Sequence, residues 1–92
     1  MSENTDVGAV LDERHTTYGT FSGVARVTQH LKHSLKQGDS YHKLAPDQKE
    51  SLDMIASKLG RIVNGDPDYA DSWVDIAGYA KLISDRLEGN ER

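Results

Sequence analysis

The helical character of the chain is clearest in residues 46–65, PDQKESLDMIASKLGRIVNG. Pro46 suits the first position of a helix, where the missing N–H would have no helical partner, and Gly65 suits its end. Four apolar side chains between them recur at the three- and four-residue spacing that places them on one helical face: Leu52, Ile55, Leu59 and Ile62. The stretch therefore predicts an amphipathic helix from Pro46 to about Asn64.

The same spacing predicts three more helices, and no stretch alternates as a β-strand would. A short helix follows Asp6, its expected N-cap, and ends near His15. A longer one runs from Thr20 to about Gln37, and the last from about Asp71 to Glu88. Their apolar stripes comprise Val7, Val10 and Leu11, beside Arg14, in the first; Phe21, Val24, Thr28, Leu31 and Leu35, flanked by Val27, in the second; and Trp73, Ile76, Ala77, Ala80, Ile83 and Leu87 in the last.

Glycines and short connections indicate how these helices are joined. Gly38 is predicted to end the second helix in the left-handed conformation, and Gly89 to close the last helix. Short connections make consecutive helices antiparallel, so the expected fold class is all-α: a small antiparallel helical bundle of three long helices plus a short N-terminal helix. With 92 residues, the chain is expected to form a single helical domain, 1–92, whose residues 1–5 and 89–92 are flexible.

The composition limits the classes of function. A domain this small buries a modest share of its surface, and without cysteine it has no disulfide, thiolate metal site or catalytic cysteine. We therefore expect a homo-oligomer. The net charge of −4 and the aromatic content of 7% argue against DNA or RNA as partners. No signal peptide or membrane-spanning run is visible, so we expect a cytoplasmic protein with no membrane partner.

Two of the predicted helices carry a second column of side chains beside the apolar stripe. The columns are Ser72, Asp75, Tyr79, Leu82 and Arg86 on the last helix, and Glu50, Met54, Lys58 and Arg61 on the helix before it. A helix that buries one face does not need a methionine, a tyrosine and a leucine outside that face. We expect a subunit interface or a ligand at these columns.

Two pairs of carboxylates have the spacing that places both members on one helical face: Glu50 with Asp53, and Asp71 with Asp75. Carboxylate oxygens that converge from facing helices can hold magnesium or manganese. All four residues also lie in or near first helical turns, where negative charge interacts favourably with the helix dipole. The sequence alone does not decide whether these carboxylates bind a metal ion or only stabilise the helix N-termini.

The stretch HTTYG, residues 15–19, follows Arg14 and combines hydroxyl groups with a glycine. Backbone N–H groups at the start of a helix, a glycine that permits close approach and nearby cations would together form a phosphate site. Lys58 and Arg61 are the further cations, and Tyr18 or Trp73 could stack on a base. The alternative is that Lys58 and Arg61 lie beside the apolar stripe and pair with Glu50 or Asp75. Hydroxyl donors would come from Thr17, Thr20 and Ser22.

Other chemistry has less support. His30 and His33 are three apart but lie opposite the apolar stripe of their helix, and no third ligand with suitable spacing is visible, so we expect a solvated pair. His15 is the histidine that adjoins the HTTYG turn. No serine has a nucleophile motif, and no Walker-type glycine loop is present.

A resemblance to a known group rests on two stretches: SLDMIASKLGRIVNGDPDYADSWVDIAGYAKL, residues 51–82, and ERHTTYG, residues 13–19. Together they resemble small, all-helical, largely phage-encoded proteins that are similar to the MazG-like nucleotide pyrophosphohydrolases and the nucleotide-modification-associated domains. The resemblance covers about residues 13–87 and implies an oligomeric helical bundle that binds a nucleotide between helices. In the catalytic relatives, a Glu-x-x-Glu pair and a Glu-x-x-Asp pair hold magnesium. By resemblance, Glu50 and Asp53 match the first pair and Asp75 the final aspartate of the second.

The sequence departs from that catalytic pattern. Ser72 lies three before Asp75, where a carboxylate is expected, and the nearest acid, Asp71, is one position off. Lys58 and Arg61 add positive charge where a metal would favour acids. We therefore expect a phage-type binder that sequesters a phosphate-containing nucleotide, such as a host-defence signalling nucleotide, without turnover in the host-cell cytoplasm.

Two alternatives remain: a magnesium-dependent MazG-like pyrophosphohydrolase, and a protein–protein interaction module. The expected ligand is a linear or cyclic nucleotide, and no cofactor is expected unless the chain is a hydrolase. In that case Glu50, Asp53, Asp71 and Asp75 would hold magnesium. The expected ligand site comprises Arg14, His15, Thr17, Tyr18, Gly19, Lys58, Arg61, Trp73, Asp75 and Tyr79.

Overall fold

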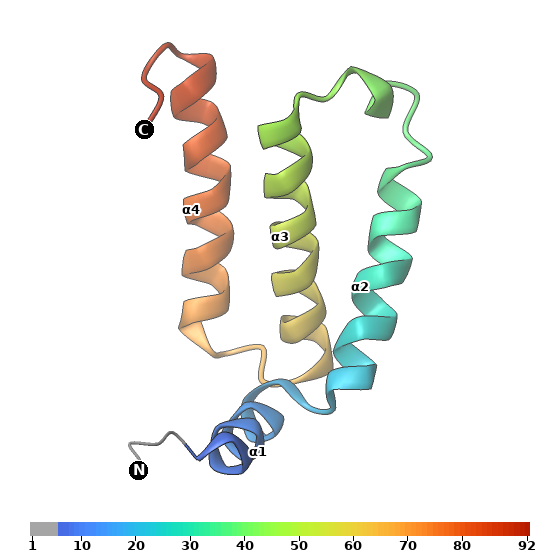
Figure 1. Ribbon diagram of the computed structural model, residues 1–92, viewed down its shortest axis with the longest axis vertical. Helices are drawn as coiled ribbons and strands as arrows, with labels where there is room; N and C mark the ends of the chain where they lie inside the picture. Colours follow the sequence, from blue (N-terminus) through green and yellow to red (C-terminus); the bar gives the residue numbers. More distant parts are fainter. Residues whose placement is uncertain (1–5) are drawn as a thin grey trace.

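The computed structural model describes residues 6–92, and all of its regular structure is helical (Figure 1). The elements are α1 (Val7–Tyr18), α2 (Phe21–Leu35), the 3-10 helix η1 (Tyr41–Lys43), α3 (Pro46–Asn64) and α4 (Ala70–Leu87). Four α-helices and no strand in this range confirm the all-α prediction. No helix of the described range is both long and apolar enough to cross a membrane. The flexibility expected of residues 1–5 lies outside the described residues.

Three helices begin where the local sequence predicts. The Asp6 carboxylate accepts a hydrogen bond from the Ala9 N–H at 3.1 Å and caps α1. The Thr20 hydroxyl accepts one from the Gly23 N–H, also at 3.1 Å, and caps α2. Pro46 occupies the first position of α3. These side chains satisfy or remove N–H groups that lack a helical partner, which confirms the predicted starts.

The end of α1 differs from the prediction. The helix continues past His15 to Tyr18, and within it the hydroxyls of Thr16 and Thr17 donate to carbonyl oxygens one turn earlier, at 3.1 and 3.2 Å. Gly19, with φ of 80°, then ends it. Most of HTTYG is thus the last turn of a helix, and the connection to α2 is only Gly19 and the N-cap Thr20.

The prediction that Gly38 is left-handed is wrong. Helix α2 ends at Leu35, and the chain continues in right-handed turns closed by bonds from the N–H of Gln37 to Ser34 O and of Gly38 to Leu35 O. Of the glycines within residues 6–92, only Gly19 and Gly89 have positive φ. Gly89, with φ of 88°, donates to Arg86 O and closes α4 as expected.

Helix α3 is the centre of the molecule. Helices α2, α3 and α4 run side by side in alternating directions, and α3 packs against both neighbours, which do not pack against each other (Figure 1). Helix α1 lies at the end where α2 begins and α3 ends, and it contacts both. The radius of gyration, 15.7 Å, exceeds the roughly 12 Å of a compact domain of this length. The chain therefore forms an open layer of helices.

The buried part of this layer is small. Val24, Ala56 and Ile62 are the buried apolar side chains of the described range. Glycine permits the close contact of α2 and α3, because Gly60 lies against Val24 and Thr28 and a β-carbon there would collide with the Thr28 hydroxyl. The other buried polar or charged residues are Ser51, Ser72 and Asp85.

The predicted apolar stripes are therefore only partly buried. Val24, Thr28 and Ile62 are buried as expected, but Phe21 is 86% exposed. The remaining exceptions are exposed too: Val7, Leu11, Leu35, Trp73, Ala77, Ala80 and Leu87. The physical reason is the open layer, in which α2 and α4 pack mainly on α3 and α1 buries no side chain.

Candidate functional site

A pocket of about 420 Å³ opens where α1, α2 and α3 meet. Its lining combines cationic and hydroxyl groups with an apolar surface, and it contains no carboxylate among the described residues. The lining residues are Leu11, Arg14, His15, Tyr18, Gly19, Phe21, Val24, Ser57 and Arg61. We refer to it as the α1–α3 pocket.

Arg61 and Tyr18 form one wall of this pocket. The guanidinium carbon of Arg61 lies 4.6 Å from the centroid of the Tyr18 ring, which is a cation–π contact. The ring of Tyr69 meets that of Tyr18 edge-on, with centroids 5.9 Å apart. Stacking holds the guanidinium in place without using its N–H donors. Those donors have no ion-pair partner within residues 6–92.

Asn64, one turn after Arg61 on α3, fixes the connection between α1 and α2. Its Nδ2 donates to the carbonyl oxygens of Tyr18 at 2.9 Å and of Thr20 at 3.2 Å. One amide group thus satisfies a carbonyl on each side of Gly19. The contact sets the position of Tyr18 relative to Arg61.

Two glycines allow the backbones to approach each other at this point. A β-carbon at Gly19 would lie 2.5 Å from the Asn64 carbonyl oxygen, and one at Gly65 would collide with the Tyr18 backbone. The N–H of Asp66 also donates to Thr17 O at 2.7 Å. The start of the α3–α4 connection is therefore bound directly to the end of α1.

Five of the predicted ligand-site residues meet in the α1–α3 pocket: Arg14, His15, Tyr18, Gly19 and Arg61. Thr17 lies next to them, but its hydroxyl donates to Glu13 O within α1, and it does not line the pocket.

Lys58 lies outside this pocket. Its ammonium group is 3.1 Å from Asp75 Oδ2, and its side chain is only 12% exposed. The alternative that Lys58 pairs with Asp75 is confirmed. Asp75 and Tyr79 line a separate pocket on α4 with Val74, Gly78 and Leu82. The Tyr79 carbonyl accepts from the Ser51 hydroxyl at 3.3 Å.

The second columns predicted on α3 and α4 thus contribute to contacts within the chain. The Lys58–Asp75 pair joins the two helices, and Ser72 is buried. Trp73 lies apart from both pockets, with its Nε1–H donating to Pro67 O at 2.8 Å.

The four carboxylates considered as magnesium ligands are not brought together. Asp75 pairs with Lys58, and Asp71 accepts a hydrogen bond from the Tyr69 hydroxyl at 3.2 Å, which raises the pKa of Tyr69. Nowhere in residues 6–92 do three metal-ligating side chains converge. The carboxylates of a single chain therefore do not fit the magnesium site of the catalytic pattern.

Comparison with known proteins gives one match. A family model described as "Domain of unknown function (DUF6378)" matches residues 5–87. The chain belongs to this family. No curated protein and no solved structure matches the chain. The DUF6378 match includes all four helices and the whole lining of the α1–α3 pocket.

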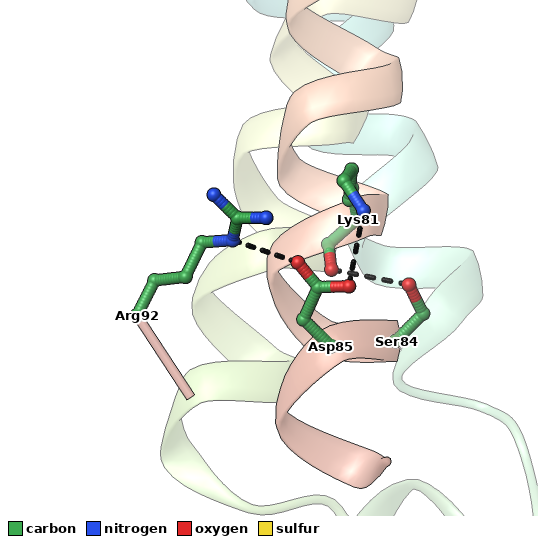
Figure 2. A network of polar contacts seen from close by, with 4 residues as sticks. All are labelled: Lys81, Ser84, Asp85 and Arg92. Carbon is green, nitrogen blue, oxygen red and sulfur yellow. Dashed lines mark hydrogen bonds and ion pairs between the residues drawn. The ribbon is translucent and has the colours of Figure 1, made fainter. Parts of the chain in front are cut away.

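Four other cationic side chains of the described range are already paired: Lys58, Lys81, Arg86 and Arg92. At the end of α4, the carboxylate of Asp85 accepts from Arg92 at 2.8 Å and from Lys81 at 3.1 Å, and Ser84 donates to Lys81 O (Figure 2). The hydrogen bonds from Arg92 and then Lys81 lower the pKa of Asp85. These cations stabilise the fold around a buried carboxylate.

Arg86 is paired in the same way. It donates to both oxygens of Asp47 at 2.7 Å, which joins α4 to the start of α3. This hydrogen bonding lowers the pKa of Asp47 and raises that of Arg86. Arg14 and Arg61 differ, since neither has a carboxylate partner in the described range.

Four residues that line the α1–α3 pocket are not among the predicted ligand-site residues: Leu11, Phe21, Val24 and Ser57. The first three belong to apolar stripes, which the sequence assigns to the core. Ser57 lies four residues before Arg61, so both share one face of α3. That spacing is the signal that could have identified it.

Proposed function

We propose that this chain binds a phosphate-containing nucleotide, linear or cyclic, in the α1–α3 pocket and holds it without turnover. The observation that carries the proposal is the meeting of Arg14, His15 and Arg61 in one pocket whose lining, in the described range, has no carboxylate. Guanidinium groups recognise phosphate through several charge-assisted hydrogen bonds. Arg61 is already oriented by the Tyr18 ring, so less conformational freedom is lost on binding.

The absence of turnover is supported by the types of residue in the pocket. Phosphoryl hydrolysis in the catalytic relatives uses magnesium held by carboxylates, whereas here the pocket offers cations to the phosphates directly. Asp75, matched by resemblance to the last magnesium ligand, is paired with Lys58. A protein with these features retains its ligand and acts by mass action.

The biological role follows from the resemblance to phage-encoded MazG-like proteins. A small protein that binds a signalling nucleotide and does not cleave it lowers the free concentration of that signal by mass action. We therefore propose that the chain sequesters a host-defence nucleotide in the cytoplasm of the infected cell.

A second copy of the chain completes the fold in this proposal. A groove of about 370 Å³ runs between α3 and α4, and most of its lining is apolar: Leu44, Leu52, Ile55, Ala80, Ile83 and Leu87, with Gln48, Ser51 and Ser84. An uncovered apolar groove on so small a domain favours self-association. Packing of two layers groove to groove would convert each open layer into a closed antiparallel bundle.

The ligand proposal is tested by thermal unfolding of the purified chain with mononucleotides, cyclic dinucleotides and ADP-ribose derivatives, with and without magnesium. A bound nucleotide at a hundred times its dissociation constant adds about 2.7 kcal/mol to the free energy of unfolding. Arg14→Ala and Arg61→Ala should abolish this stabilisation. Arg26→Ala is the matched control, because Arg26 is exposed on α2 and does not line the pocket.

Mass spectrometry of nucleotide released from heat-denatured protein separates the three functions. An intact nucleotide, recovered after incubation with magnesium, supports the binder. Magnesium-dependent release of pyrophosphate, lost in Glu50→Gln, would instead establish the pyrophosphohydrolase. If no nucleotide raises the melting temperature, both nucleotide functions are excluded and the protein–protein interaction module becomes the favoured function.

A further inference from the structure

The α1–α3 pocket carries an aromatic ring next to its cations. Phe21, the first residue of α2, lines the pocket together with Arg14 and Arg61, yet it is 86% exposed. Leu11 is exposed in the same lining, and Val24 is buried beneath it in the α2 stripe. Large apolar side chains in water favour an occupant that covers them. The position of Phe21 indicates that this occupant also contacts the cations.

The other aromatic rings near the pocket are already engaged. Tyr18 carries the Arg61 guanidinium on its ring face and the Tyr69 ring at its edge. Trp73 is held by the Pro67 carbonyl and does not line the pocket. Of the aromatic residues in the lining, Phe21 has its ring free to accept a planar partner.

We infer that Phe21 is the base-stacking residue of the pocket, so that its ligand carries a planar heterocycle on Phe21 and a phosphate on Arg14 and Arg61. This inference rests on the proposed function and adds a subsite to it. Stacking on an aromatic ring tolerates any base, because every base has a π-face. The phosphates and the base would therefore contribute separately to affinity.

Isothermal titration calorimetry with ADP and with inorganic pyrophosphate separates these contributions. The wild-type chain should bind ADP more tightly than pyrophosphate by about 5- to 150-fold, the range that one base–aromatic stack supplies. Phe21→Ala should lower ADP affinity to the pyrophosphate level and leave pyrophosphate affinity unchanged. Phe21→Tyr should keep the preference for ADP. Trp73→Ala, which removes an exposed ring outside the pocket, should change neither affinity.

Any other outcome contradicts the inference, and the measured affinities show which part of it is wrong. If Phe21→Ala keeps the preference for ADP, or if ADP and pyrophosphate bind the wild-type chain equally, the base subsite is wrong and the phosphate site stands. If neither ADP nor pyrophosphate binds, this inference fails, and the nucleotide panel described above decides separately whether the proposed function stands. If sedimentation equilibrium shows that Phe21→Ala lowers the number of subunits, Phe21 belongs to a subunit interface instead.

Discussion

Asn64 connects parts of the chain that are far apart in sequence. Its amide is the donor to Tyr18 and Thr20, 46 and 44 residues earlier, and it lies one turn from Arg61. Arg61, one of the two arginines proposed to bind phosphate, and Asn64, which holds the backbone beside Tyr18, therefore lie at the same end of α3. A residue that contacts no ligand can thus determine the geometry of the pocket.

Asn64→Ala should lower the free energy of unfolding by about 1–3 kcal/mol, because it leaves the Tyr18 carbonyl oxygen without its donor and removes the second of two donors to Thr20 O, which still accepts from the Val24 N–H. It should also weaken nucleotide binding, since Tyr18 and Arg61 lose their alignment. Urea unfolding and calorimetric titration measure the two effects. Asn90→Ala is the control, because the Asn90 contact with Asp85 uses the backbone N–H. Equal stability of both variants would contradict the role of Asn64.

Asp85 gives a pH-dependent prediction. Its pKa is lowered in the folded chain by Arg92 and Lys81, so the ionised form stabilises the fold above the unfolded pKa of about 3.9. That contribution is lost as the pH falls through the lower folded pKa. Asp85→Asn should therefore be less stable than wild type at pH 7, and the difference should shrink below about pH 4. Urea unfolding from pH 7 to pH 2 tests this, and a pH-independent difference would refute it.

At the scale of the elements, two helical glycines, Gly60 and Gly78, allow a matched test of the contact between α2 and α3. Gly60→Ala should destabilise the chain by about 1–3 kcal/mol, because its methyl group would collide with the Thr28 hydroxyl between α2 and α3. Gly78 has open space around it on α4. Gly78→Ala should therefore stabilise by up to about 1 kcal/mol through helix propensity. Thermal unfolding of both variants tests the α2–α3 contact, and a stabilising Gly60→Ala would contradict it.

The element boundaries were largely predictable because they depend on local chemistry. Thr20 and Pro46 start helices by satisfying or removing N–H groups of their own turn, and Gly89 ends one by adopting positive φ. Gly38 was assigned incorrectly since several backbone paths can leave a helix, and here right-handed turns do so. The direction that the chain takes after a helix depends on which element it packs against next, and the residues around the helix end do not determine that element.

The residues of the α1–α3 pocket were predictable only in part, because tertiary packing decides which side chains of one helical face meet. Lys58 and Arg61 are three residues apart and belong to one predicted column, yet Lys58 pairs with α4 and Arg61 stacks on α1. Their separation arises because α3 is packed between other helices. Phe21 was assigned to the core because periodicity identifies an apolar face but does not identify what covers it.

At the scale of the molecule, the uncovered groove between α3 and α4 is the surface on which we propose that a second copy packs. The predicted core residues Ile55 and Ile83 line this groove, and Ala80 in it is exposed. The sequence predicts that these side chains are buried, but a single chain leaves them in an open groove. A second copy packed on the groove would bury them and so account for the pattern.

Ala80→Glu should convert the oligomer to a monomer, because it places a charge in the apolar groove. Its melting temperature should become independent of protein concentration, whereas that of the wild type should rise with concentration. Val63→Glu is the control, since Val63 is exposed on α3 outside the groove. Sedimentation equilibrium measures the subunit number, circular dichroism verifies helix content, and a monomeric wild type would disprove the groove interface.

The way in which α1 is attached to the rest of the chain should affect the affinity of the α1–α3 pocket for the proposed nucleotide. This helix has no buried side chain, and hydrogen bonds at its last turn tie it to α3 and the residues that follow. It nevertheless contributes Leu11, Arg14 and His15 to the pocket. Any molecule in which α1 detached would lack those walls, so the apparent dissociation constant of the proposed nucleotide would equal the intrinsic one divided by the fraction with α1 docked. Under the proposed function, ligand binding and docking of α1 would stabilise each other, and mutations that loosen α1 should weaken binding even at positions that do not contact the ligand.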